Sequence, residues 1–209
     1  MKRVEIAVIG GGLLGSAFAY GLSKCSNSVG LIDEGDNAIR AARGNFGLVW
    51  VQGKGRGMPE YARWSLKSAN DWLAFSNELG ENTGSSVGYH RPGGFCIAVD
   101  DDELSTNLEI LEQLREEAGA DGYEYEVVEN PALANQLPGI GPEVPGATYC
   151  PHDGHANPLR LLRALQTRDP DFSVRVHAAL GAAYARWALD LERASVSAAA
   201  VAAKDEAID

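Results

Sequence analysis

The chain begins with two short apolar runs that enclose a stretch of small residues. Residues 4–9 form a β-branched run that stops at Gly10, residues 13–22 are small or apolar, and Val29–Ile32 is a second run that closes at Asp33. Short β-branched runs predict strands, and the small-residue stretch predicts a helix packed closely on them. The pattern therefore predicts a strand–helix–strand unit with a glycine turn after its first strand.

The glycines of this unit have the spacing of a dinucleotide-binding turn. Gly10 permits the tight turn, Gly12 lets backbone N–H groups approach a pyrophosphate, and Gly15 lets the helix cross the strand closely. The start of the helix adds partial positive charge for the phosphates. Asp33 follows Gly15 by 18 residues, about where a carboxylate accepts hydrogen bonds from ribose hydroxyls. The residues predict dinucleotide binding.

Two other interpretations of this stretch remain open. Lys2 and Arg3 precede an apolar run, and residues 17–19 resemble a cleavage site, as in a secretory signal. Glu5 interrupts that run and argues against a signal. The second alternative is a glycine turn in an unrelated α/β domain.

Aromatic and aliphatic residues recur at near-helical spacing after residue 58, which predicts a helix. Pro59 suits the first helical position, where its missing N–H does no harm, and Gly80 is expected to end the helix. We expect the stripe to be buried core, with a ring stacked on a cofactor as the alternative. Its members are Tyr61, Trp64, Trp72, Phe75 and Leu79.

The middle of the chain alternates strand and helix patterns. Residues 93–99 predict a buried strand, and the acids at 100–103 predict a helix start, where negative charge is favourable. Gly119 is expected to end that helix. Its buried face is expected to comprise Leu104, Leu108, Leu111 and Leu114. Residues 123–128 alternate as a half-exposed strand does, and Pro131 is expected to start a short helix.

Two histidines, His152 and His155, lie three residues apart beside Asp153. The segment offers no third ligand of the usual kind, so we expect no metal site there. Asn157 and Pro158 instead predict the N-cap and first residue of a further helix.

Composition narrows the class of protein. The 209 residues carry a net charge of −11, which argues against nucleic-acid binding, and 45% of them are hydrophobic, as in a globular protein. Cys25, Cys96 and Cys150 are odd in number and far apart, which indicates reduced thiols. No apolar segment approaches the length of a membrane span. We expect a cytoplasmic protein, at most peripheral to the inner face of a membrane.

Residues 41–50 form a loop rich in small residues, with Asn45 between Gly44 and Gly47. Glycine lets backbone approach a flat ligand, and an amide both donates and accepts hydrogen bonds. A simple surface turn explains the same residues equally well. The chemistry of these residues alone favours neither a cofactor contact nor a surface turn.

The glycine turn with Asp33, followed by the segment 43–47, resembles the FAD-dependent amino-acid oxidoreductases. That family includes D-amino-acid oxidase and dehydrogenase, glycine and sarcosine oxidase, and the opine and hydroxyproline dehydrogenases. The turn at residues 153–158 is similar to one in the family as well. The resemblance favours FAD over NAD, although Asp33 suits either. The cofactor contacts that it implies are Gly10, Gly12, Leu13, Leu14, Gly15, Asp33, Glu34, Arg43, Asn45, Phe46, Gly47 and Leu48.

The resemblance also implies an activity. It implies oxidation of a small amino acid or secondary amine, with a hydride passing to flavin N5. Electrons would then pass to oxygen, to a partner subunit or to a quinone, and the sequence does not separate these. No catalytic residue is assigned, because neither Arg43 nor Arg91 can be matched to the binding of a substrate carboxylate. The alternatives are a noncatalytic dinucleotide-binding fragment and an NAD-dependent enzyme.

The pattern of elements predicts an α/β fold. The resemblance implies a Rossmann-like FAD-binding domain of the glutathione-reductase type with part of an α+β substrate domain. Residues 1–88 are expected to be the first segment of the FAD domain and 89–150 a partial substrate domain. Residues 151–168 are expected to be a helix returning to the FAD domain. Residues 169–209 are an Ala-rich tail without a counterpart in the family.

The resemblance ends near Leu165, whereas family members continue well beyond this length. We therefore expect a truncated form, with a frameshift as the leading explanation of the segment from Gln166 to Asp209. Within it, residues 174–176 have a strand pattern and residues 180–204 have helix-forming composition.

Overall fold

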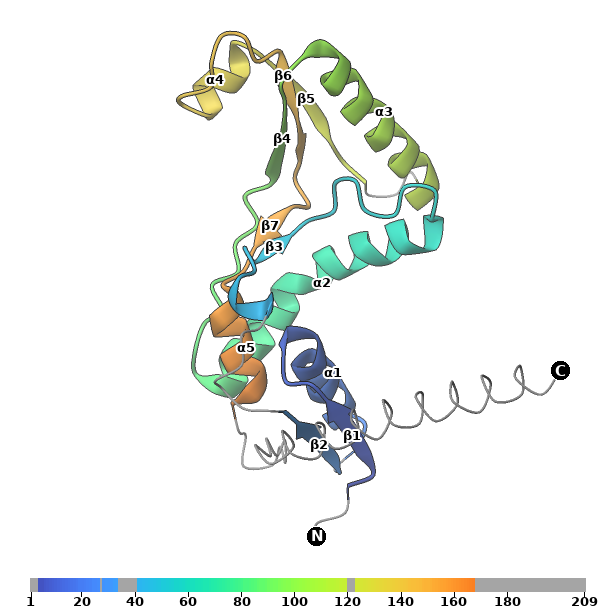
Figure 1. The fold of residues 1–209 in the computed structure, drawn as a ribbon, viewed down its shortest axis with the longest axis vertical. Helices are drawn as coiled ribbons and strands as arrows, with labels where there is room; N and C mark the ends of the chain where they lie inside the picture. The colour runs from blue at the N-terminus through green and yellow to red at the C-terminus, as the bar shows by residue number, and fades with distance from the viewer. Residues whose placement is uncertain (1–3, 27, 34–40, 120–122, 168–209) are drawn as a thin grey trace, which may run out of the picture. The chain divides into compact units, whose positions relative to one another are not determined.

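The computed structural model describes residues 4–26, 28–33, 41–119 and 123–167 (Figure 1). The chain divides into two compact units, which are described separately: Met1–Ala42 with Leu165–Asp209, and Arg43–Ala164. The predictions for Glu34 and for residues 169–209 lie outside the described residues. The division into cofactor and substrate domains stays a prediction.

The first unit contains the strand–helix–strand arrangement that the apolar pattern predicts. Strand β1 (Ile6–Ile9) and strand β2 (Val29–Ile32) are parallel, with Ile6 opposite Val29. Helix α1 (Leu13–Ser23) connects them. A small core lies between helix and strands; its buried members are Ala19, Val29 and Leu31. The unit is therefore a βαβ crossover, which brings the carboxyl ends of both strands to one edge.

The second unit contains an antiparallel sheet covered by helices. Strand β6 (Gly146–Cys150) is central, between β4 (Gly94–Ala98) and β5 (Glu126–Glu129). Two short strands, β3 (Leu48–Val49) and β7 (Gly154–His155), pair antiparallel as a separate ladder.

Four further α-helices, α2 to α5, lie in the rest of the described chain. Helix α2 (Pro59–Thr83) and helix α3 (Asp101–Ala118) pack on each other, and α3 lies along the three-stranded sheet (Figure 1). Helix α4 (Ala132–Gln136) is short, and α5 is Pro158–Gln166. The main core of the second unit lies among α2, α3 and β3; its buried residues are Val49, Val51, Ala62, Leu66, Ala69, Leu111, Leu114 and Tyr123.

Two helix ends illustrate local sequence chemistry. Asp100 caps α3 as the acidic cluster predicts, because its carboxylate accepts a hydrogen bond from the Glu103 amide at 2.8 Å. The expected end of α2 at Gly80 is wrong, since the helix continues to Thr83. Gly84 ends it instead, with a φ of 67° in the left-handed region and its N–H bonded to the Gly80 carbonyl.

The aromatic stripe of α2 is buried only in its second half. Leu79 is fully buried, and Trp72 packs on the core with its ring stacked on Tyr89. Tyr61 is 41% exposed and Trp64 is 68% exposed, so the prediction that these rings are core is wrong. Near-helical spacing places residues on one face, but in the first half of α2 the face that packs in the core is the neighbouring one, with Ala62, Leu66 and Ala69.

No helix among the described residues is long and apolar enough to span a membrane.

Candidate functional site

The predicted glycine turn joins β1 to α1 in the first unit. Gly10 has a φ of 98°, a conformation that glycine adopts without strain. Gly12 is the N-cap of α1 and has no side chain with which to cap it, and no acidic residue lies in the first turn. Leu13 and Leu14 are the first helical residues, and Leu14 is largely exposed. The uncapped amides of this turn are suited to an anion.

Asp33 directly follows β2 and lies beside the turn. Its carboxylate accepts a hydrogen bond from the Gly11 N–H. A Cβ atom on Gly11 would come within 2.8 Å of that carboxylate. The parallel pairing of β1 and β2 therefore brings together two parts of the predicted site, the glycine turn and the acid.

The glycines of the turn differ in what surrounds them. A Cβ atom on Gly15 would lie 1.9 Å from the Gly10 carbonyl oxygen, so only glycine allows the helix to pass this close to the turn. A Cβ atom on Gly12 would meet no described atom within 4 Å. The protein's own packing thus requires glycine at position 15, whereas at position 12 it leaves open space.

Gln166 is the last residue of α5, within the helix expected at residues 151–168, and contacts the turn. Its side-chain amide donates to the Gly11 carbonyl at 2.7 Å and to Ser16 Oγ at 3.1 Å. Ser16 is itself buried and donates to the same carbonyl. No local pattern could have indicated this contact, because the two partners are 155 residues apart.

The second group of predicted contacts, at residues 43–48, lies in the second unit. Arg43 ends a short 3₁₀ turn, and Phe46 is 89% exposed. Asn45 Oδ1 accepts a hydrogen bond from the Gly47 N–H, which is a turn contact within the loop. Whether this loop also contacts a cofactor stays a prediction.

Gly47 leads directly into strand β3. Its φ is 77°, and a Cβ atom there would lie 1.9 Å from the Ala156 carbonyl oxygen, so the backbone requires glycine. Leu48, the first residue of β3, is 59% exposed. Asn157 caps α5 as expected, since its Oδ1 accepts hydrogen bonds from the Leu159 and Arg160 amides.

A buried polar network joins β3 to the strands of the second unit. Asp153 is fully buried and accepts hydrogen bonds from the Val51 N–H and from Gln52 Nε2, the latter at 2.7 Å. Thr148 Oγ1 donates to Gln52 Oε1 at 2.9 Å. Burial raises the pKa of Asp153, and its hydrogen bonds to Val51 and Gln52 offset part of that effect. The network has a structural role, because its polar groups satisfy one another.

The thiols near this network are not activated. Burial raises the pKa of Cys150 to about 12, with the charge of Asp153 adding to the effect. Burial also raises the pKa of Cys96. A nucleophilic cysteine needs a lowered pKa, so neither thiol is suited to covalent catalysis.

The two histidines of the 152–155 segment have different surroundings. His152 is buried; its ring contacts an Arg91 guanidinium nitrogen at 2.8 Å and accepts from the Glu124 N–H at 3.2 Å. Arg91 also donates to the Pro151 carbonyl. His155 is exposed on β7. These contacts give His152 and Arg91 structural roles.

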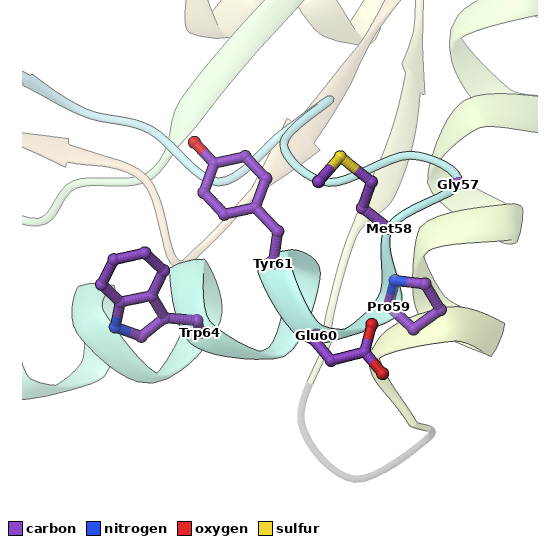
Figure 2. A pocket seen from close by; sticks show the side chains of 6 residues that line it. All are labelled: Gly57, Met58, Pro59, Glu60, Tyr61 and Trp64. Atoms are coloured by element: carbon purple, nitrogen blue, oxygen red, sulfur yellow. The ribbon is translucent and has the colours of Figure 1, made fainter.

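An open hollow of about 630 Å³ lies at the start of α2 (Figure 2). Met58 and Tyr61 extend toward the same space, while Glu60 points away from it. The Glu60 carboxylate is 3.3 Å from Arg63. The lining is completed by Gly57, Pro59 and Trp64. The side chains that face the hollow are apolar or aromatic, which is suited to contact with an apolar partner and not to acid–base chemistry.

Comparison with curated proteins shows similarity along most of the chain. A relative from Agrobacterium tumefaciens (strain Ach5), named as a subunit of opine oxidase, is 41% identical over 165 residues, which cover 79% of this chain and 44% of that protein. Glycine oxidase of Bacillus subtilis (strain 168) is 24% identical over 165 residues, with coverage of 78% and 42%. The chain therefore spans less than half the length of these relatives.

Solved structures show the same fold. Glycine oxidase from Bacillus cereus ATCC 14579 matches with a TM-score of 0.71 at 23% identity, covering 84% of this chain and 46% of that one. The result confirms the predicted α/β fold of FAD-binding oxidoreductases. A family model described as FAD dependent oxidoreductase matches residues 5–177, which extends beyond Leu165 and confirms the resemblance and FAD as the family's cofactor. The chain belongs to this FAD-dependent oxidoreductase family.

Proposed function

We propose that this chain binds FAD and forms the cofactor-binding part of an enzyme that oxidises a small amino acid or secondary amine. The substrate class is supported by the names of the relatives, which include opine oxidase, glycine oxidase and dimethylglycine dehydrogenase. When bound, FAD supplies the redox chemistry by accepting a hydride at N5. The remaining tasks, binding and orientation, belong to the protein.

The residues of the first unit fit the adenosine diphosphate half of FAD. The uncapped amides after Gly10 and Gly12 are suited to the pyrophosphate, and Asp33 is suited to the ribose hydroxyls. In the second unit, Gly47 and Leu48 are proposed to lie along the flavin, because the family resemblance implies it and Leu48 is exposed.

A partner subunit is the proposed route for electrons. The name of the relative at 41% identity identifies that protein as a subunit. A partner polypeptide or a quinone is therefore kept as the proposed electron acceptor. No catalytic residue is assigned, because Arg91 makes structural contacts with Pro151 and His152.

The observation that carries the proposal is the contrast between Gly12 and Gly15. The protein's own packing explains glycine at position 15, but it does not explain glycine at position 12. Open space at the uncapped start of α1 is what a pyrophosphate requires.

The test is FAD titration of the purified chain by flavin fluorescence and calorimetry. Gly12→Ala should keep the fold and weaken FAD binding by about tenfold or more, because its methyl group occupies the proposed pyrophosphate space. Asp33→Ala should weaken binding by about 1–3 kcal/mol through loss of a charged acceptor. Gly21→Ala is the matched control, since a Cβ atom there also meets nothing within 4 Å and lies away from the turn.

Three outcomes decide among the proposed activities. FAD affinity that is equal in Gly12→Ala, Asp33→Ala and the control would overturn the proposed binding site. Protection by NAD but not by FAD in a thermal melt would favour an NAD-dependent enzyme. FAD binding without anaerobic bleaching by proline, sarcosine or a D-amino acid would favour a noncatalytic cofactor-binding role for this chain.

A further inference from the structure

His90 and His155 face each other on neighbouring backbone segments of the second unit. Each backbone N–H donates to the carbonyl of the other residue at 2.9 Å, which forms an antiparallel bridge. Gly154 permits this approach, because a Cβ atom there would lie 2.4 Å from the His90 carbonyl oxygen. Directly opposed residues of such a bridge project their side chains to the same face.

The two imidazole rings are close together and exposed, and their nitrogen atoms are available to bind a ligand. Their centroids are 5.5 Å apart, with an angle of 37° between the ring planes. Both residues are exposed. Within the described part of the chain, neither ring has a hydrogen bond or an ion pair. His152 is different, because its ring is buried and bonded to Arg91. The available pair therefore joins residues 65 positions apart (155 − 90), not the neighbours His152 and His155.

The spacing of the rings suits a shared metal ion. A metal–nitrogen bond of about 2.1 Å, with about 1.1 Å from the nitrogen to the ring centre, places each ring centre about 3.2 Å from the metal. Two such centres separated by 5.5 Å subtend roughly 120° at the metal, near the tetrahedral angle that zinc adopts.

We propose that His90 and His155 form a binding site for one divalent transition-metal ion, with Zn²⁺, Ni²⁺ and Cu²⁺ as the chemical class. Imidazole nitrogen suits these ions, whereas Mg²⁺ and Ca²⁺ select oxygen ligands. Among the described residues no group of three or more His, Cys, Asp or Glu side chains gathers around one point. The protein thus supplies two ligands, and water or a small anion completes the coordination. Leu48, which is proposed to lie along the flavin, is directly opposite His155, so the metal site adjoins that residue. The metal-binding test itself does not require FAD.

The test uses the full chain without an affinity tag, titrated with NiCl₂ and with ZnCl₂ in a calorimeter near neutral pH. The wild-type chain should bind one ion at this site. His90→Asn and His155→Asn should each weaken that binding by at least about tenfold, since each removes one of only two protein ligands. The double variant should bind the metal no more weakly than either single variant, because losing one histidine already removes the two-ligand chelate.

The matched control is His177→Asn, which removes a histidine outside the described residues and should leave the affinity unchanged. Melting curves without metal establish that each variant folds, and a metal-dependent rise in Tm should occur only in the wild type and the control. His90→Gln and His155→Gln provide a second pair if an Asn variant fails to fold. If each single variant bound half as many ions per chain as the wild type, each histidine would bind metal independently. That result would overturn the proposal. Affinity unchanged in both single variants would overturn it as well.

Discussion

The glycine turn of the first unit and the Asp153 network of the second differ in how far apart along the chain their contacting residues are. In the first unit, Gly15 approaches Gly10 across one turn, and Gly11 bonds to Asp33 over 22 residues. In the second, Gln52 and Asp153 are 101 residues apart, and His90 pairs with His155 across three intervening strands. The contacts between the glycine turn and Asp33 are formed within one supersecondary motif. The Gln166 contact with Gly11 and the contacts of the second unit instead join distant segments.

The difference explains why the glycine turn follows from a local pattern and the Asp153 network does not. Spacing rules for a βαβ unit arise from a single crossover, so a short sequence contains the whole geometry. A network between distant strands depends on which strands pair and in what register. We therefore expect substitutions in the glycine turn to change the stability of the βαβ unit alone. Substitutions in the Asp153 network should change the stability of segments distant in sequence.

The largest effect is expected from Asp153→Ala in the second unit. The substitution leaves the buried Val51 N–H and one Gln52 N–H without their acceptor, which should lower the free energy of unfolding by about 3 kcal/mol. Urea denaturation followed by tryptophan fluorescence measures this change. Asp101→Ala is the control, because Asp101 is exposed at the start of α3 and contributes only a few tenths to about 1 kcal/mol. Equal loss in both variants would show that the network contributes nothing specific.

Gly15→Ala in the first unit is expected to have the next largest effect. A Cβ atom 1.9 Å from the Gly10 carbonyl oxygen forces the helix away from the turn, at a cost of about 2 kcal/mol. Gly21→Ala in the same helix should instead stabilise it by about 0.5–1 kcal/mol, because alanine favours helix and the space is open.

Hydrogen exchange of the amides of α1 measures both variants. Protection should fall in Gly15→Ala and rise in Gly21→Ala, while amides of α2 and α3 should be unchanged. Loss of protection in α2 would show that the substitution does not act locally in the first unit.

The smallest expected effect is the change in the free energy of unfolding with pH that arises from the titration of Asp153. Burial raises the pKa of this carboxyl in the folded protein above its ordinary value of about 3.9. The folded state therefore binds the proton more tightly than the unfolded state does. The resulting stability is fully present below the ordinary pKa and is lost as the pH rises through the raised pKa.

Asp153→Asn removes this titration. The free energy of unfolding of the wild type, relative to Asp153→Asn, should fall as the pH rises above about 4 and then level off. Urea unfolding at a series of pH values measures the difference. A difference that grows with pH would show that the hydrogen bonds from Val51 and Gln52 outweigh the cost of burying the charge.

Much of the fold was predictable because its signals are local. The βαβ unit, the Asp100 cap of α3 and the Asn157 cap of α5 each depend on residues within one turn or one crossover. The end of α2 was predicted wrongly at Gly80. Glycine is tolerated inside a helix, and Gly84, four residues later, adopts the left-handed conformation that ends it.

The candidate site was predictable in its glycines and in Asp33, but not in the contacts that support them. Gln166 reaches Gly11 from the far end of the described chain. Asn45 has the turn contact that the simpler interpretation predicts. Tyr61 and Trp64 have helical spacing but remain exposed, because the core beside this part of α2 packs on the neighbouring face that carries Ala62, Leu66 and Ala69.

The sequence by itself determined the βαβ unit, the helix starts and the membership of a flavin-dependent family, because each is encoded in residues close together along the chain. Only the tertiary structure decided that Asp153 is held by Val51 and Gln52, and that His155 pairs with His90 and not with His152. The physical reason is that strand pairing brings together segments far apart in sequence. A periodic pattern specifies which face a side chain occupies, but not which distant side chain lies opposite it.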